Sequence, residues 1–416
     1  MKASAILISS LIIIAACTWK TQTEPIATFV VGAGEYNRIN TPVFADVSEL
    51  TLNTYQLVEV ADGVAKEIPT QLAKGENGDL LWWVLDGETQ AGHSRRYELR
   101  KTKPSRSFHP VNITDVNEDI QFDIAGKKVL AYHYGLTPVP EGVSEVYRRG
   151  GYIHPLWSPM GEVLTRIQPP DHYHHYGIWN PWTSTEFQGQ EVDFWNLNKK
   201  QGTVIVSTAP SATGGPVFAD LIAYHQHIVL PDSMHNEIRP ALNEEWRIRV
   251  WNADPLQKIW LVDFVSVLSC ATESPLTIKE YRYQGFSIRA HENWNDNNTV
   301  LLTSAGKNKS DANATRARWI DINGASKTGN SGLSIMTHPD NFNFPEQLRI
   351  WPTGTNDGEE NVFVNFNPAQ DRDWQLVPGE RYTLKYRMMI YDGSIDSMKA
   401  ENYWNDYAHP PIVRIN

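Results

Sequence analysis

The chain has 416 residues, with 37 lysines and arginines against 48 aspartates and glutamates, and a formal net charge of −11 at pH 7. It contains no block of basic residues, which argues against nucleic acid as a partner. Cys270, one of two cysteines, lies in an apolar run and is expected to be a small buried hydrophobe, and no intrachain disulfide is expected. The length predicts one large domain or two of unequal size.

The first 17 residues have the pattern of a secretion signal. Met1-Lys2 is followed by an apolar run, Ala3 to Ala16, which is too short to span a bilayer as a mature helix. The segment Ile14-Ala15-Ala16-Cys17 resembles the lipobox of bacterial lipoproteins. This resemblance implies cleavage before Cys17, a lipid anchor on that cysteine, and location on the periplasmic or cell-surface side of the outer membrane. Residues 18–27 are then a tether, and the membrane is contacted through the lipid alone.

The rest of the chain has a β pattern. Short apolar runs, many of them with period 2, recur between turn residues, and they predict an all-β protein. Residues 28–102 are expected to form a small N-terminal β-sandwich module. After a charged, proline-bearing stretch, residues 110–416 are expected to form a large antiparallel β-sandwich. Near its end, residues 394–407 have helical spacing, and Asp396 or Ser397 is the expected N-cap.

Three of the 13 histidines lie within four residues, at His172, His174 and His175. They follow Pro169-Pro170 and Asp171, so the cluster is expected on a held, irregular loop. Histidine titrates near neutral pH and is a common metal ligand. The cluster therefore favours proton transfer or metal binding over core packing. Trp179 and Trp182 follow closely, and aromatic faces beside polar groups are typical of carbohydrate sites.

Several motifs resemble the PmoA-like domain family. They are residues 152–156 (YIHPL), Arg166, residues 171–177 (DHYHHYG), residues 192–195 (VDFW), Lys279-Glu280 through Arg289, Arg318-Trp319 and residues 337–341 (THPDN). A membrane copper oxygenase, which the family's name suggests, would need several membrane-spanning helices, and this sequence contains none. The resemblance implies instead a galactose-mutarotase-like sandwich. It also implies a lyase or dehydratase that acts on uronic-acid oligosaccharides from polysaccharides such as algal ulvan. Tyr173 and Tyr176 depart from the common pattern, in which proline and arginine are usual.

β-Elimination on a uronate requires a base, an acid and a partner for the carboxylate. The sequence offers as acid–base candidates His154, His174, His175, Tyr176 and Glu280. The expected substrate-binding residues are Arg166, Asp171, His172, Trp182, Arg289, Arg318, His338, Asn341 and Arg349. Arginine suits this task because its planar fork pairs with a carboxylate through two hydrogen bonds.

Other functions remain open at this point. A glycoside hydrolase or sugar epimerase could use the same scaffold, and a glycan-binding lipoprotein would need no catalytic residues. No cofactor is established by the sequence, although Asp171, His172, His174 and His338 leave a divalent metal open. The segment 279–289 is expected to be a strand with one polar face, and residues 337–345 a loop that contributes to the site.

Overall fold

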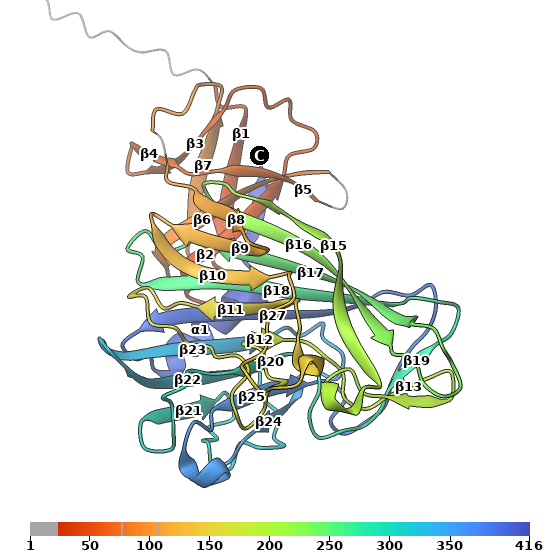
Figure 1. The fold of residues 1–416 in the computed structure, drawn as a ribbon. Helices are drawn as coiled ribbons and strands as arrows, with labels where there is room; N and C mark the ends of the chain where they lie inside the picture. Colours follow the sequence, from red (N-terminus) through yellow and green to blue (C-terminus); the bar gives the residue numbers. More distant parts are fainter. Residues whose placement is uncertain (1–23, 76–77, 107) are drawn as a thin grey trace, which may run out of the picture.

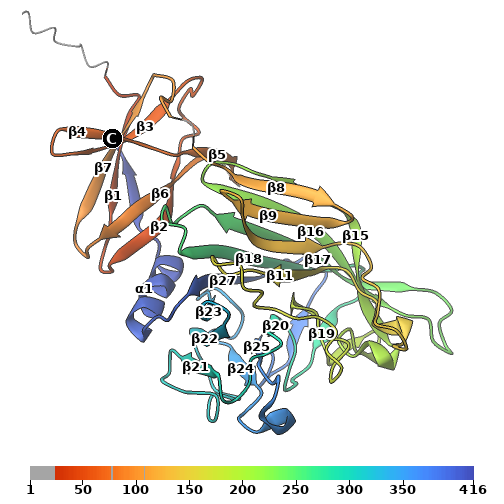
Figure 2. The ribbon, with the colours of Figure 1, turned by 60° about the vertical axis from the view of Figure 1, so that its left-hand side comes forward.

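The computed structural model describes residues 24–75, 78–106 and 108–416. The proposed signal segment, Cys17 and most of the tether lie outside this range. Within it, strands β1 to β28 dominate, accompanied by one α-helix and three short 3-10 helices. None of the described helices is long and apolar enough to cross a membrane. Figures 1 and 2 show a small module at one end of a larger, layered domain.

The small module consists of two facing sheets. The first sheet has the order β28 (Ile412–Ile415), β1 (Ala27–Gly32), β7 (Ser94–Arg100), β3 (Gln56–Ala61) and β4 (Val64–Ile68). The second has the order β2 (Arg38–Asp46), β6 (Asp79–Thr89) and β5 (Gln71–Lys74). Phe29, Trp83 and Tyr97 are fully buried between them. The sequence placed residues 412–415 with the large domain, but they pair with β1 in the small module, where the C-terminus is marked in both views.

The large domain is built from two eight-stranded antiparallel sheets. The long sheet has the order β15 (Gly202–Thr213), β16 (Phe218–Val229), β17 (Arg239–Trp251), β18 (Ile259–Cys270), β27 (Tyr382–Asp392), β23 (Gly329–Thr337), β22 (Trp319–Ser326) and β21 (Thr299–Thr303). The second sheet is called the site sheet, because the pocket described below lies on it. Its order is β24 (Gln347–Ile350), β25 (Phe363–Asn367), β20 (Ser287–Arg289), β12 (Ile178–Trp179), β11 (Tyr152–Leu156), β10 (Lys127–His133), β9 (Asp119–Ile124) and β8 (Val111–Val116). A smaller sheet at one end has the order β14 (Gln190–Val192), β13 (Thr185–Phe187), β19 (Leu276–Ile278) and β26 (Trp374–Leu376).

Period-2 alternation places the core between the two large sheets. In β17, Trp246, Ile248 and Val250 are buried, whereas the intervening Arg247 is exposed. One continuous apolar cluster joins these side chains to residues of the site sheet such as Ile153, Ile178 and Val364. Successive side chains of a strand point to opposite faces. The neighbours Tyr152, Trp179 and Phe363 therefore lie on the outer face of the site sheet, where they form a separate aromatic cluster.

The helix α1 (Ser397–Ala408) packs against the long sheet through Ala400, Tyr403 and Trp404. Its N-cap is Asp396, whose Oδ1 accepts a hydrogen bond from the Lys399 N–H at 2.7 Å. The predicted helix and the first of its two proposed caps are thus confirmed. The predicted fold class is also confirmed: a large antiparallel β-sandwich with a small N-terminal β module and a short C-terminal helix. A buried ion pair, Arg38 Nη1 to Asp406 Oδ1 at 3.1 Å, connects the module to α1.

Candidate functional site

A pocket of about 360 Å³ opens over the outer face of the site sheet. Strands β11, β12, β20, β25 and β24 lie side by side in this sheet (Figure 1). The pocket is lined by Asp171, His172, His174, His175, Trp195, Asn196, Arg282, Tyr283, Arg349, Trp351, Thr355, Asn356 and Phe363. The histidine segment thus lies in the wall of a cavity, on the loop between β11 and β12.

Local hydrogen bonds hold the histidine loop in place. The His172 N–H donates to the Pro169 carbonyl at 2.9 Å, and the Gln168 N–H donates to the His175 carbonyl at 2.8 Å. The chain then re-enters the sheet through Gly177, at φ 53°. A Cβ atom at this position would collide with the Ile153 carbonyl oxygen, so glycine is required here. The loop is therefore closed on itself and fixed at the sheet.

His175 is the buried member of the cluster, at 3% exposure. Its ring stacks on Phe363 with centroids 5.1 Å apart, and it also packs against Trp179 at 5.0 Å and His172 at 4.6 Å. Burial, with a further contribution from His174, holds the pKa of His175 well below the ordinary value. Burial also lowers the pKa of His174 to about 4, and nearby His172 adds to this effect. Both rings are therefore neutral near pH 7.

Asp171 and His172 form a hydrogen-bonded pair. His172 Nδ1 lies 3.0 Å from Asp171 Oδ2, and Arg289 Nη2 donates to the same oxygen at 2.8 Å. Burial opposes ionisation of Asp171, but the bonds from His172 and Arg289 outweigh it and lower the pKa of this carboxyl to about 2. Because an ionised carboxylate can only accept, the proton of neutral His172 resides on Nδ1 and leaves a lone pair on Nε2. His172 is thus arranged as a base.

The arginines around the site fall into two classes. Arg166 donates to Glu360 Oε2 at 2.7 Å, and Arg289 Nη2 donates to Asp171 and to the Glu360 carbonyl at 2.7 Å, so each is paired with a protein carboxylate, although Arg289 Nε and Nη1 have no partner among the described residues. Arg282 and Arg349 line the pocket, and neither has a carboxylate within 4.0 Å among the residues that the structure describes. Arg349 Nη1 donates to the neutral Asn313 Oδ1, at 3.1 Å. Burial lowers the pKa of Arg349, and the nearby Arg282 lowers it further.

Three of the predicted acid–base residues do not line the pocket. Tyr176 is fully buried, and its hydroxyl donates to the Tyr147 carbonyl and accepts from Gln168. His154 Nδ1 is 2.9 Å from Thr165 Oγ1, and burial lowers the pKa of its imidazole to about 4. Glu280 is exposed outside the pocket, and its backbone N–H donates to Asp373. None of these three side chains is among the described residues that line the pocket.

Four predicted binding residues also lie elsewhere. Trp182 is fully buried in the core and packs against Trp374. Arg318 pairs with Glu401 of α1 at 2.6 Å. His338 and Asn341 follow β23 of the long sheet, where His338 packs against Tyr407 and Asn341 bonds to Glu346 and Lys385. Of the predicted binding residues, Asp171, His172 and Arg349 line the pocket, and Arg289 and Arg166 support its wall.

Sequence reasoning did not select Asn196, Arg282, Tyr283, Thr355, Asn356 or Phe363 as site residues. The sequence predicts a strand over residues 279–289, and this prediction is wrong for most of the segment. It gave no reason to place the side chains of Arg282 and Tyr283 in a pocket. Only Ser287–Arg289 forms a strand, and the Gln284 side chain instead bonds to the backbone of Thr183 and Ser184. Alternation along a strand therefore could not show which of these side chains face the pocket.

The described residues contain no set of side chains that could bind a metal ion. Among these residues, no group of three or more His, Cys, Asp or Glu side chains is arranged to hold a metal ion. His172 directs its Nδ1 to Asp171, and the His174 ring packs against the rings of His172 and His175. His338, the fourth proposed ligand, packs against Tyr407 of α1.

No curated protein sequence matches this chain. One similar solved structure is a protein of glycosyl hydrolase family 38 from Enterococcus faecalis, with a TM-score of 0.48 and 9% identity over 94% of this chain and 47% of that one. The chain therefore spans about half the length of that protein. A TPR-domain containing protein from Parabacteroides distasonis is less similar, with a TM-score of 0.20 and 13% identity over 86% of this chain and 57% of that one.

A family model corrects the resemblance inferred from the sequence motifs. It matches residues 119–405, which contain the long sheet, all of the site sheet except β8, and the pocket. This family is not the PmoA-like domain family, so that interpretation was wrong. The chain belongs to the family of unknown function DUF6807.

Proposed function

We propose that this protein is a carbohydrate-active lyase that cleaves uronic-acid-containing oligosaccharides by β-elimination in the His172 pocket. One observation carries the proposal. The same cavity contains a histidine whose Nδ1 is fixed by a carboxylate, and two arginines, Arg282 and Arg349, that lack an acidic partner among the described residues. The first can act as a base, and the other two can neutralise an anion on the substrate.

The arginine pair would bind the uronate carboxylate. Removing the C5 proton is feasible only if the adjacent carboxylate is neutralised or hydrogen-bonded, because negative charge builds up on it in the transition state. Guanidinium groups do this through paired hydrogen bonds. Like charges held close together in a partly buried wall are unfavourable without an anion, which supports a ligand between Arg282 and Arg349.

His172 and Tyr283 would transfer the protons. His172 Nε2 takes the C5 proton, the electron pair forms the C4–C5 double bond, and the C4–O bond breaks. The departing oxygen takes a proton from Tyr283, whose hydroxyl contacts the Asn196 side chain. Burial raises the pKa of Tyr283, so it remains protonated and can donate. Asp171 stabilises the imidazolium that forms on His172, as a general acid–base mechanism requires.

Aromatic side chains support a sugar as the substrate. Trp195, Trp351 and Phe363 line the pocket beside Asn196 and the arginines. Flat aromatic faces pack against sugar C–H groups, while amides and guanidinium groups bond to hydroxyls.

The composition of the pocket favours elimination over hydrolysis. Retaining and inverting glycosidases use two carboxyl groups that flank the scissile bond. Asp171 is the one acidic residue among the described residues that line the pocket, and it is bonded to His172 and Arg289. A sugar epimerase would share the base, and a binding protein would need neither proton donor nor base.

Incubation with a panel of uronic-acid oligosaccharides tests the proposal. Elimination creates a double bond conjugated to the carboxylate, which absorbs in the ultraviolet, whereas hydrolysis and epimerisation do not. We expect absorbance to increase with the native protein and not with His172→Ala. New reducing ends without this absorbance would indicate a hydrolase, and binding without any product would indicate a glycan-binding protein.

A further inference from the structure

One wall of the pocket is a short segment with an uncommon backbone, residues 354–361, here called the strap. It contains the 3-10 helix η3 (Thr355–Gly358), and it contributes Thr355 and Asn356 to the pocket. Five of its residues have positive φ: Gly354, Asn356, Asp357, Gly358 and Glu360. Left-handed conformations cost a non-glycine residue about 1–2 kcal/mol. The strap therefore needs bonds from outside to keep this shape.

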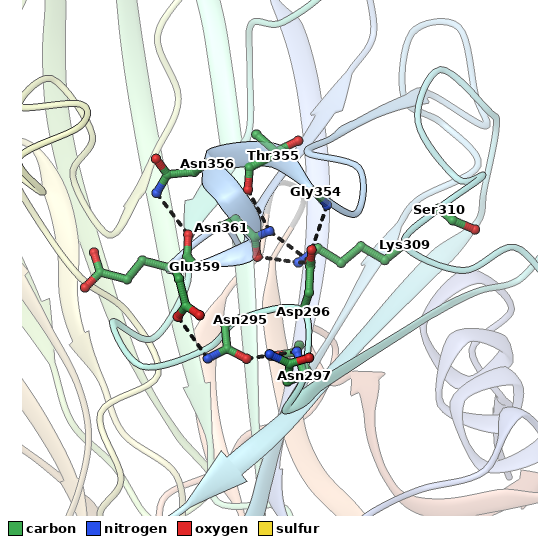
Figure 3. Close-up of polar contacts among 12 residues, drawn as sticks. Asn295, Asp296, Asn297, Lys309, Ser310, Gly354, Thr355, Asn356, Glu359 and Asn361 are labelled. Atoms are coloured by element: carbon green, nitrogen blue, oxygen red, sulfur yellow. Dashed lines mark hydrogen bonds and ion pairs between the residues drawn. The ribbon is translucent and has the colours of Figure 1, made fainter.

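Lys309, which does not line the pocket, lies at the centre of the hydrogen bonds that hold the strap (Figure 3). The residue is buried, and its Nζ bonds to Asp296 Oδ1 at 2.6 Å and to Asn361 Oδ1. Asp296 in turn accepts from the Gly354 N–H at 2.6 Å and donates its own N–H to the Gly358 carbonyl at 2.9 Å. Asn361 Nδ2 donates to the Thr355 carbonyl at 2.9 Å. Lys309 thus joins both ends of the strap to one carboxylate.

The strap is also bonded to the charged groups behind His172. The Glu360 carbonyl accepts from Arg289 Nη2, and the Glu360 side chain accepts from Arg166. The same Arg289 nitrogen donates to the Asp171 oxygen that holds His172. A continuous set of contacts therefore leads from Lys309 through the strap and Arg289 to the His172 imidazole, against which the rings of His174 and His175 also pack.

We propose that Lys309 is a positioning residue: it fixes the strap, and through Glu360 and Arg289 it sets the geometry of the Asp171–His172 pair and of the pocket wall. A buried ion pair is weak evidence for stability, since desolvation offsets its attraction, and such pairs can instead specify one conformation. Lysine suits this role because its ammonium group has three donors, enough for Asp296 and Asn361 together. The kinetic part of this inference rests on the proposed function, and the part that concerns His172 does not.

The test compares Lys309→Met with Lys309→Arg and with a control, Lys307→Met. Lys307 lies on the same loop, between β21 and β22, and its exposed side chain pairs with Asp311 at 3.1 Å. On a uronate substrate we expect Lys309→Met to lower kcat/KM at least about tenfold, because both the strap and the base are displaced. Lys309→Arg should recover part of this loss, and Lys307→Met should match the native protein.

A second measurement needs no substrate. Nuclear magnetic resonance should show the Nδ1–H signal of His172 shifting in Lys309→Met, because a loosened Arg289 alters the hydrogen bond between this group and Asp171. If no uronate is cleaved but this signal shifts, the positioning role stands and the proposed function fails. Unchanged kinetics and an unchanged Nδ1–H signal would overturn the inference. If Lys309→Met does not fold, Lys309→Gln, which keeps a donor in the buried site, should show the same shifts at smaller size.

Discussion

His172 Nδ1 and Asp171 Oδ2 lie 3.0 Å apart, and this contact determines which ring nitrogen of His172 is free to act as a base. The sequence had favoured His174 and His175 for proton transfer. The structure places His172 in the pocket wall with an oriented carboxylate, whereas burial makes both other histidines difficult to protonate.

We therefore expect His172→Ala to lower turnover of a uronate substrate at least about a hundredfold, the usual scale for a lost general base. The melting temperature should change little, because substitution of a partly exposed loop residue typically alters stability by under about 0.5 kcal/mol. Steady-state kinetics and a thermal melt check both statements. His93→Ala, a substitution at an exposed residue of the small module, is the control. Native turnover in His172→Ala would remove His172 from the mechanism.

His175 should behave as part of the aromatic cluster. His175→Ala is expected to destabilise the protein by about 2–4 kcal/mol, because it leaves a cavity between Phe363 and Trp179. His175 Nδ1 has no hydrogen-bond partner among the described residues, so His175→Phe should keep most of the stability. Urea unfolding measures both changes. Retained turnover in His175→Phe would confirm a packing role. Complete loss of turnover in a folded His175→Phe variant would show that His175 takes part in the reaction.

Arg282 and Arg349 are expected to recognise the substrate carboxylate. Replacing either with alanine leaves that anion poorly paired, at a cost of about 2–5 kcal/mol. Lysine should be a poor substitute, since it cannot form the paired bonds of the guanidinium group. The comparison is between a uronate substrate and its carboxyl-reduced, neutral analogue. A loss confined to the uronate supports recognition of the anion, whereas equal losses on both would show that these arginines only support the pocket.

Buried neutral histidines should make the fold sensitive to mild acid. Burial lowers the pKa of His154 to about 4, from an ordinary value of 6.5, and that of His225 to about 3. Below about pH 6.5 these histidines bind protons in the unfolded chain but stay neutral in the folded protein. The free energy of unfolding therefore falls as the pH drops from about 6.5 to about 4. Each group contributes up to about 1.4 kcal/mol per pH unit. Urea unfolding at several pH values should show a smaller slope for His154→Gln, and an unchanged slope would contradict this prediction.

The location of the protein remains a proposal that depends on Cys17. If this cysteine carries a lipid, Cys17→Ala should no longer partition with outer-membrane lipoproteins after cell fractionation. The native protein, processed in the same way, is the reference. Membrane partitioning that survives the substitution would disprove the lipid anchor.

The sequence predicted the fold better than the site because the fold depends on local patterns. Alternation of buried and exposed residues, as in β17, predicts strands, and Asp396 marks the start of α1. The histidine loop could also be located, since its residue types and its two prolines are adjacent in the chain. The sequence could not predict which arginines lack an acidic partner in the pocket. The pairing of Arg166 depends on Glu360, nearly 200 residues away, and on a left-handed backbone around Glu360 that no sequence periodicity reveals.

The same reason explains the misplaced residues. Arg318, His338 and Asn341 have chemistry suited to a sugar site, but they belong to strands and loops of the long sheet. Sequence order does not indicate which of two stacked sheets a segment joins. Contacts formed across the sandwich determine this.

The pairing of β28 with β1 has a consequence for how the chain is made. Phe29 lies opposite Ile415 in this ladder, so one edge of the first strand is completed by residues that leave the ribosome nearly 390 positions later. Until then β1 presents unpaired backbone groups, which can capture strands of other chains. Synthesis from the N-terminus therefore completes the small module last, after the large domain has emerged. Nascent chains stalled before residue 412 should accordingly hold the module open and prone to aggregation.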